Sequence, residues 1–329
     1  MPADPTPRRA GLATAPARPH AAQLPKKVAA AVDAFQSACD LRMAQANEAA
    51  APKNPLFHYT KEKALFGILD SGKLWFTSIY HMDDPEELNF GFGVARELFK
   101  EAAGRSRGLA RRFCRERAED ADRQRIRELI AFYSVSFGLR DVEKQWTKYA
   151  DEGRGVALGL APEFFTPAPF EDPDNPRPEE IIFYGKVSYG PKDGRARHEQ
   201  VVDGALALIE QVQRRKWLGS SEEAALFCHH LRATIYTEIL WNCVTTKDAT
   251  WSYQNEMRIL ARNVLKKPDL LLVNAEERPR VELVQPRLRQ SIAEIMVGPK
   301  ADGATLQRVR AGFSARGLGK VPVTQASAQ

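Results

Sequence analysis

The sequence predicts an α+β fold, in which a mixed, mainly antiparallel sheet forms the core and helices flank it. Short apolar segments of strand length occur together with longer segments of helical periodicity. The two kinds of segment do not follow the regular strand–helix–strand order of a doubly wound parallel sheet. The chain has 329 residues, of which 43% are hydrophobic, so it is long enough to bury a substantial core.

The N-terminal segment divides into a tail and a helix. Residues 1–25 are rich in Ala and Pro and contain few large apolar side chains, so we expect a disordered tail. From Lys26 to about Ala50, apolar side chains recur at helical spacing, which predicts an amphipathic helix packed on the main domain or on a partner. Residues 26–53 are therefore expected to be an N-terminal helix and linker, ended by prolines.

Residues 54–325 are expected to form a single α+β domain with a charged helical insertion at about 105–130. We expect Thr60 to cap the first helix and Ser71-Gly72 to end it. Strands are predicted at 56–60, 74–79, 131–138, 155–160, 181–189, 253–261, 270–273, 281–284, 292–297 and 321–323. Helices are predicted at 61–70, from the acidic loop 83–87 towards 100, and at 105–131, 141–150, 197–216, 221–244 and 302–315.

Composition and charge exclude several classes of protein. The four cysteines are scattered without a C-x-x-C pair, so neither a disulfide framework nor a structural zinc site is expected. There is no run of 18 apolar residues and no apolar stretch of signal-peptide type at the N-terminus, so we expect a cytoplasmic protein without a membrane partner.

The net charge of +6 is concentrated in two places, residues 1–30 and residues 105–127, whereas the remainder is slightly acidic. An arginine cluster in the second segment is a candidate phosphate-binding surface for nucleic acid. The interleaved acidic residues favour a solvated helix instead. The arginines concerned are Arg105, Arg107, Arg111, Arg112 and Arg115.

The predicted strand 253–261 carries the best candidate chemistry. Gln254, Glu256 and Arg258 alternate towards one face of this strand. That face borders either solvent, where the glutamate and the arginine form an exposed ion pair, or a polar cleft. In a cleft, Glu256 would act on a substrate that Arg258 holds. His58, in an apolar strand, is either a structural histidine or a site residue.

Two further groups of residues are candidates for binding a ligand or a metal. Trp146 and Tyr149 lie three residues apart on one predicted helix and could stack on a planar ligand, although such pairs are more often part of a core. Asp83, Asp84 and Glu86 could bind a divalent cation together with Glu256, but this pattern is also a common way to begin a helix. We therefore expect no metal.

Several collinear stretches resemble the bacterial domain-of-unknown-function family 2971. They include His58-Tyr59-Thr60, the segment 68–74, Asp84-Pro85-Glu86, the segments 134–137 and 145–155, Glu256-Met257-Arg258-Ile259 and 295–299. The sequence departs from the family where Gln254 replaces an acidic residue and Met257 replaces an aromatic one. The family has no settled biochemistry, so this resemblance implies a fold and not a function.

A second resemblance is to ADP-ribosyltransferases of the His-Tyr-Glu type. It rests on an opening strand with His-Tyr-Thr, a short helix ending at Ser-Gly, and a late Gln-x-Glu. It implies that His58 binds the NAD ribose and that Glu256 stabilises the oxocarbenium-like centre. Tyr59, Thr60, Gln254 and Arg258 would lie around the NAD. The stacking aromatic has no clear match, and Tyr80, Trp146 and Tyr149 are candidates.

Three functions follow from these observations. The first is an NAD-dependent ADP-ribosyltransferase-like enzyme, of toxin or defence-effector type, which modifies a protein or nucleic-acid acceptor without a metal. The second is a non-catalytic nucleic-acid-associated binding protein that uses the arginine cluster. The third is a metal-dependent hydrolase or nuclease that uses the acidic loop and Glu256.

Overall fold

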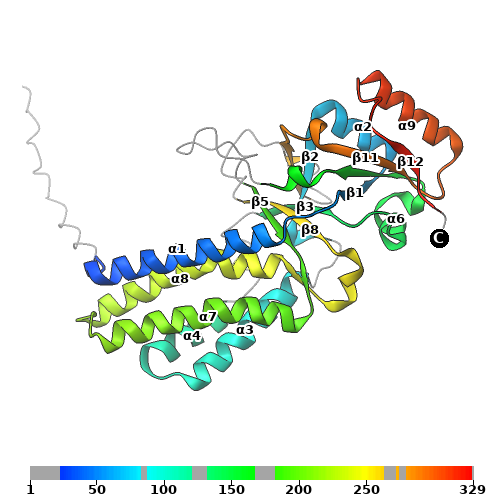
Figure 1. Ribbon diagram of the computed structural model, residues 1–329. Helices are drawn as coiled ribbons and strands as arrows, with labels where there is room; N and C mark the ends of the chain where they lie inside the picture. The colour runs from blue at the N-terminus through cyan, green and yellow to red at the C-terminus, as the bar shows by residue number, and fades with distance from the viewer. Residues whose placement is uncertain are drawn as a thin grey trace, which may run out of the picture.

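The computed structural model describes residues 23–82, 87–120, 132–166, 182–262, 272–273 and 279–327. A group of long helices lies at one end of the molecule, and the β-strands, with shorter helices beside them, lie at the other (Figure 1). The strands are mainly antiparallel, which confirms the predicted α+β class.

A four-stranded sheet forms the part farthest from the long helices. Its order is β1 (Leu56–Thr60), β4 (Val156–Leu160), β11 (Ile292–Val297) and β12 (Val323–Gln325), antiparallel except for the last pair. One face of this sheet packs in a core with α2 (Glu62–Ser71) and α9 (Gly303–Ala315). The other face packs against α6 (Glu143–Tyr149). This sheet carries His58 in its strand β1.

A six-stranded antiparallel sheet lies next to it. Its order is β5 (Ile182–Lys186), β8 (Met257–Arg262), β3 (Phe132–Phe137), β2 (Lys73–Ser78), β10 (Arg280–Val284) and β9 (Leu272–Val273). Phe57 and Gly138 form a bridge between the two sheets. Alternation along β3 sends Tyr133, Val135 and Phe137 into the shared core and Ser134 and Ser136 to the opposite face. That opposite, polar face carries the site described below.

The long helices form a bundle with a core of its own. It contains α1 (Lys26–Ala49), α3 (Glu87–Arg105), α4 (Gly108–Asp120), α7 (Pro191–Arg214) and α8 (Ser221–Val244). The predicted N-terminal helix is confirmed, and it packs along α8 and α7 rather than standing apart (Figure 1). A two-stranded parallel pair, β6 (Ser188–Tyr189) with β7 (Thr246–Lys247), joins the bundle to the six-stranded sheet.

Most predicted elements are confirmed, with three corrections. Gly72 ends α2 in the left-handed conformation, as expected, but Lys61 rather than Thr60 is the residue before its first turn. Helix α7 begins at Pro191 and not at residue 197 as predicted, because proline is well suited to a first helical turn. The strand predicted at 253–261 begins only at Met257, since Ala249–Gln254 form a 3₁₀ turn (η5) and Asn255 is left-handed at φ 38°.

Parts of the prediction lie outside the described residues. These are the tail up to residue 22, the acidic residues 83–86, and residues 121–131 of the charged segment. The helical character of the charged segment is confirmed over Gly108–Asp120. None of the described helices combines the length and apolar character that crossing a bilayer requires.

Candidate functional site

A pocket of about 210 Å³ opens on the polar face of the six-stranded sheet, where β1, β3, α6, β7 and η5 (Ala249–Gln254) meet. Its volume lies below the roughly 300–1,000 Å³ of pockets for drug-sized ligands, so it fits a small molecule or one part of a larger one. Rings and polar groups both line it, in the mixture that fixes and orients a ligand.

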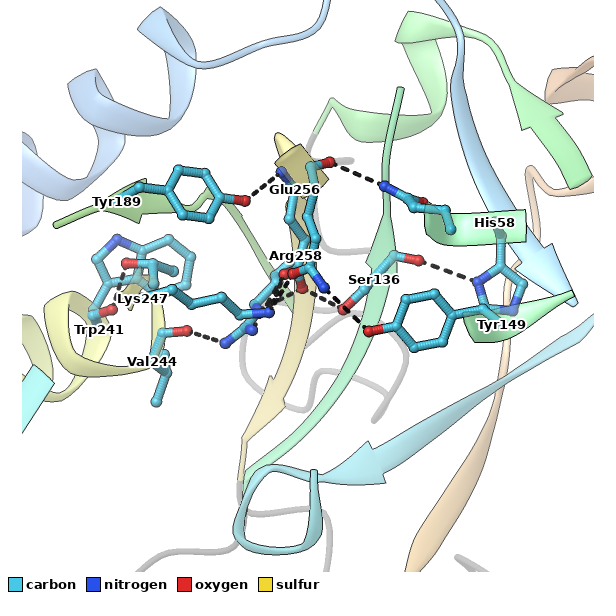
Figure 2. A network of polar contacts seen from close by, with 12 residues as sticks. His58, Ser136, Tyr149, Tyr189, Trp241, Val244, Lys247, Glu256 and Arg258 are labelled. Atoms are coloured by element: carbon cyan, nitrogen blue, oxygen red, sulfur yellow. Dashed lines mark hydrogen bonds and ion pairs between the residues drawn. The ribbon is translucent and has the colours of Figure 1, made fainter. Parts of the chain in front are cut away.

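The Glu256 carboxylate lies at the centre of a buried polar network (Figure 2). Its Oε1 accepts hydrogen bonds from Ser136 Oγ and from Arg258 Nε, the latter at 2.7 Å. Its Oε2 accepts from Lys247 Nζ at 2.5 Å and from Arg258 Nη2 at 3.3 Å. Two cations and a hydroxyl therefore hold this carboxylate in one orientation.

Arg258 links the Glu256 carboxylate to the helical bundle through hydrogen bonds to both. Its side chain is only 1% exposed, and its Nη1 donates to the Val244 carbonyl at 2.5 Å, at the end of α8. Glu256 is likewise 3% exposed and Gln254 4% exposed. The interpretation of these side chains as an exposed, solvated strand face is therefore wrong. The ion pair is present, but it is buried where the bundle covers the sheet.

His58 reaches the same network from the other sheet. Its Nδ1 lies 3.1 Å from the Ser136 carbonyl oxygen, a contact that requires a proton on Nδ1. Burial lowers the pKa of His58 below its usual 6.5, so the ring is neutral at pH 7. Among the described residues no hydrogen bond to Nε2 is found, so this atom can accept one from a ligand.

Ser136 thus connects the two principal candidates. Its carbonyl contacts His58 and its hydroxyl donates to Glu256, although these residues lie far apart in the sequence. Ser134, two residues earlier on the same face of β3, lines the pocket as well. Its Oγ is buried and has no hydrogen-bond partner among the described residues. A buried hydroxyl without a partner is unusual and is available to a ligand.

Gln254 and Tyr149 join the network at the pocket wall. Gln254 Oε1 accepts from Lys247 Nζ at 2.8 Å, and Gln254 Nε2 donates to the Tyr149 hydroxyl at 3.1 Å. Gln145 Nε2 donates to the Gln254 carbonyl at 3.1 Å, which fixes η5 against α6. Of the candidate stacking residues, Tyr149 is the one that the structure places in the pocket wall.

Other predicted site residues lie elsewhere or are engaged in packing. Trp146 is 2% exposed, donates to Asp141 Oδ1 at 2.8 Å and does not line the pocket. Tyr80 packs in a separate apolar cluster. Tyr59 reaches the pocket wall, but its hydroxyl donates to the Leu139 carbonyl and accepts from a backbone amide. Thr60 does not line the pocket.

Sequence reasoning missed several pocket residues, namely Trp75, Ser134, Ser136, Gln145, Lys148, Lys247 and Trp251. The serines alternate with apolar residues along a strand, and this pattern could have identified them as one polar face. Lys247 precedes a turn and has no pattern of its own. Its position depends on the pairing of β7 with β6, a contact between distant segments.

The two alternative sites predicted from the sequence are the arginine cluster and the acidic metal site. Arg105 pairs with Asp203 at 2.7 Å and Arg112 with Glu116 at 3.8 Å, while Arg107, Arg111 and Arg115 are exposed. Within the described part of the chain, no three His, Cys, Asp or Glu side chains are grouped as a metal site requires. Asp83, Asp84 and Glu86 lie outside the described residues, so the structure does not address their role.

A family described as "Protein of unknown function (DUF2971)" matches residues 145–259. The match supports the resemblance inferred from the motifs. It includes Lys247, Gln254, Glu256 and Arg258, but neither His58 nor Ser136. No curated protein and no solved structure matches the chain.

Proposed function

We propose that the pocket binds NAD and that the chain transfers its ADP-ribose unit to an acceptor, with release of nicotinamide. One observation supports this most. His58, from the opening strand, and Glu256, next to the late strand β8, meet at one pocket through a shared contact with Ser136. These are the two residues that the resemblance to His-Tyr-Glu ADP-ribosyltransferases picks out, and nothing local in the sequence brings them together.

The reaction breaks the bond between C1′ of the ribose and the nicotinamide nitrogen. The electron pair of that bond leaves with nicotinamide, and positive charge develops on the ribose. An acceptor oxygen or nitrogen then forms a bond to C1′ and loses a proton to solvent or to a base. The Glu256 carboxylate would stabilise the developing positive charge electrostatically.

The neighbours of Glu256 have complementary roles in this proposal. Arg258 does not line the pocket and would hold the carboxylate from behind, whereas Lys247 lines the pocket beside it. The contact between Lys247 and Oε2 is therefore the one that an approaching ribose would meet. The neutral His58 Nε2 would accept a hydrogen bond from a ribose hydroxyl and fix the sugar's position.

The test is nicotinamide release from NAD by purified protein, with and without a cell lysate and nucleic acid as acceptors. We expect release by the wild type and at least a hundredfold loss in Glu256→Gln, a typical magnitude for removing one electrostatic stabiliser. Arg258→Met is the matched control, because it breaks the same buried ion pair but keeps the carboxylate. It should retain more activity than Glu256→Gln.

The two variants separate chemistry from folding. Equal loss in both would mean that Glu256 acts through the stability of the network rather than on the substrate. An active Glu256→Gln protein, or no release by the wild type with any acceptor, would refute the proposal. His58 and Glu256 would then be structural residues of a binding protein.

A further inference from the structure

Two lysines of α6 and two aromatic rings of η5 form a strip that begins at the pocket and continues beyond it. Lys148 Nζ lies 4.2 Å from the centre of the Trp251 ring, and Lys144 Nζ lies 4.7 Å from the centre of the Tyr253 ring. The two lysines are four residues apart, so they share one side of the helix. The two rings belong to η5 and lie 6.1 Å apart. We call these four side chains the lysine–aromatic strip.

Charge is segregated around α6. Lys144 and Lys148 are exposed, and among the described residues neither has a carboxylate within ion-pair distance. Glu143 and Asp141 line a separate hollow together with Glu152, away from the strip. The two lysines therefore give the strip a positive charge at the surface, and its two rings are half-buried beside them.

The strip is continuous with the pocket. Lys148 and Trp251 line the pocket, whereas Lys144 and Tyr253 lie beyond it. An extended ligand lying along the strip would have one end at the pocket, beside Glu256, and would continue over Lys144 and Tyr253.

We propose that the lysine–aromatic strip docks a single-stranded nucleic acid and presents one of its bases to the pocket. Two successive units, each a cation next to a ring, match the phosphate-and-base repeat of a polynucleotide. Proteins bind single strands in this way, because lysines neutralise phosphates and aromatic rings stack on bases. A duplex hides its base faces, so rings at a surface favour a single strand. The role of this strand as acceptor rests on the proposed function, but the docking itself does not.

The strip fits this partner better than the arginine cluster at the end of α3 and on α4 does. In that cluster Arg105 and Arg112 already pair with Asp203 and Glu116, and the hollow between the arginines has no aromatic lining. A protein acceptor would need no repeated ring surface. An acidic peptide is therefore the competitor used in the test below.

The test measures binding of fluorescently labelled 12-mers of deoxythymidine and of uridine by fluorescence anisotropy. We expect the wild type to bind, with an affinity that falls as salt rises. Lys144→Gln combined with Tyr253→Ala should weaken binding about tenfold, a magnitude typical of losing one base stack and one phosphate contact. The matched control, Arg111→Gln combined with Arg115→Gln, should change affinity less than twofold. Comparing the two oligonucleotides identifies the preferred sugar.

Three results would overturn the docking proposal. They are equal affinity in the wild type and the strip variant, a larger loss in the arginine control, and equal competition by a polyglutamate peptide. Lys144→Glu alone is a second variant, which leaves the Tyr253 side chain in place. It should weaken oligonucleotide binding by at least the amount expected for losing one phosphate contact.

Measuring nicotinamide release distinguishes failure of the docking proposal from failure of the proposed transferase function. Neither Lys144 nor Tyr253 lines the pocket, so the strip variant should hydrolyse NAD at the basal rate but lose stimulation by the oligonucleotide. Strip-dependent binding without any nicotinamide release would support docking and refute the transferase. Release that the oligonucleotide stimulates equally in the wild type and the strip variant would refute docking and support the transferase.

Discussion

Two arginine–glutamate pairs in this protein have the same chemistry but differ in burial. In the first, Arg258 Nε and Nη2 lie 2.7 and 3.3 Å from the Glu256 oxygens, and the two side chains are 1% and 4% exposed. In the second, Arg140 Nε and Nη2 each lie 3.1 Å from the Glu294 oxygens, with 52% and 20% exposure. Substituting each arginine by methionine therefore tests what burial adds.

The expected free-energy changes differ several-fold. Removing one partner of a buried pair costs about 3–5 kcal/mol, because the remaining charge stays buried. Glu256 keeps its contacts with Lys247 and Ser136, so Arg258→Met should cost about 3 kcal/mol, at the lower end of that range. Arg140→Met should cost no more than about 1 kcal/mol, as exposed pairs do.

The measurement is urea unfolding followed by circular dichroism, with the free energies compared between the two variants and the wild type. Arg258→Met should unfold at a clearly lower urea concentration than Arg140→Met. If the two variants lose equal stability, burial does not make the Glu256 network more sensitive to the loss of its arginine than the exposed pair is.

Three further predictions follow from single contacts. Gly72→Ala, at the end of α2, should destabilise the protein by about 1 kcal/mol because Gly72 has φ 65°. Gly67→Ala, in the exposed middle of α2 with open space around it, should stabilise the protein by about 0.5–1 kcal/mol, and thermal melting of both variants measures the difference. Burial lowers the pKa of His198 from 6.5 to about 3, so the unfolded chain takes up the proton first and the free energy of unfolding falls as the pH drops below 6.5. Between pH 8 and pH 5, His198→Gln should therefore lose about 2 kcal/mol less of its free energy of unfolding than the wild type does, as measured by urea unfolding at each pH. Trp146→Phe should cost about 1–2 kcal/mol through its lost hydrogen bond to Asp141 but leave nicotinamide release unchanged, and a fall in release would place Trp146 in the site after all.

The sequence predicted local features of this fold well where one segment decides the outcome. Helix α2 with its glycine end, and the apolar strands β1 and β4, follow from patterns within ten residues. Face alternation also placed Glu256 and Arg258 together correctly. It misplaced the start of their strand, because η5 and the left-handed Asn255 take up residues that have strand-like composition.

Burial could not be predicted in the same way. The polar strand face became a buried network because α8 ends against it and supplies the Val244 carbonyl. No pattern around Arg258 signals that a helix ending 14 residues earlier covers it. Lys247 and Ser136 were missed for a similar reason, since each gains its role only through contact with a distant segment.

The shared contact at Ser136 also has a consequence for the order in which the protein is made. The hydroxyl of Ser136 and the carboxylate it contacts are 120 residues apart, and the His58 contact spans a further 78 residues in the other direction. During synthesis on the ribosome, the strands that carry His58 and Ser136 emerge long before their acidic partner. A fragment limited to residues 145–259 would carry Lys247, Glu256 and Arg258 without the strand whose Ser136 hydroxyl donates to Glu256. The pocket is thus assembled late, when nearly the whole chain is available, and a nascent or truncated chain lacks it.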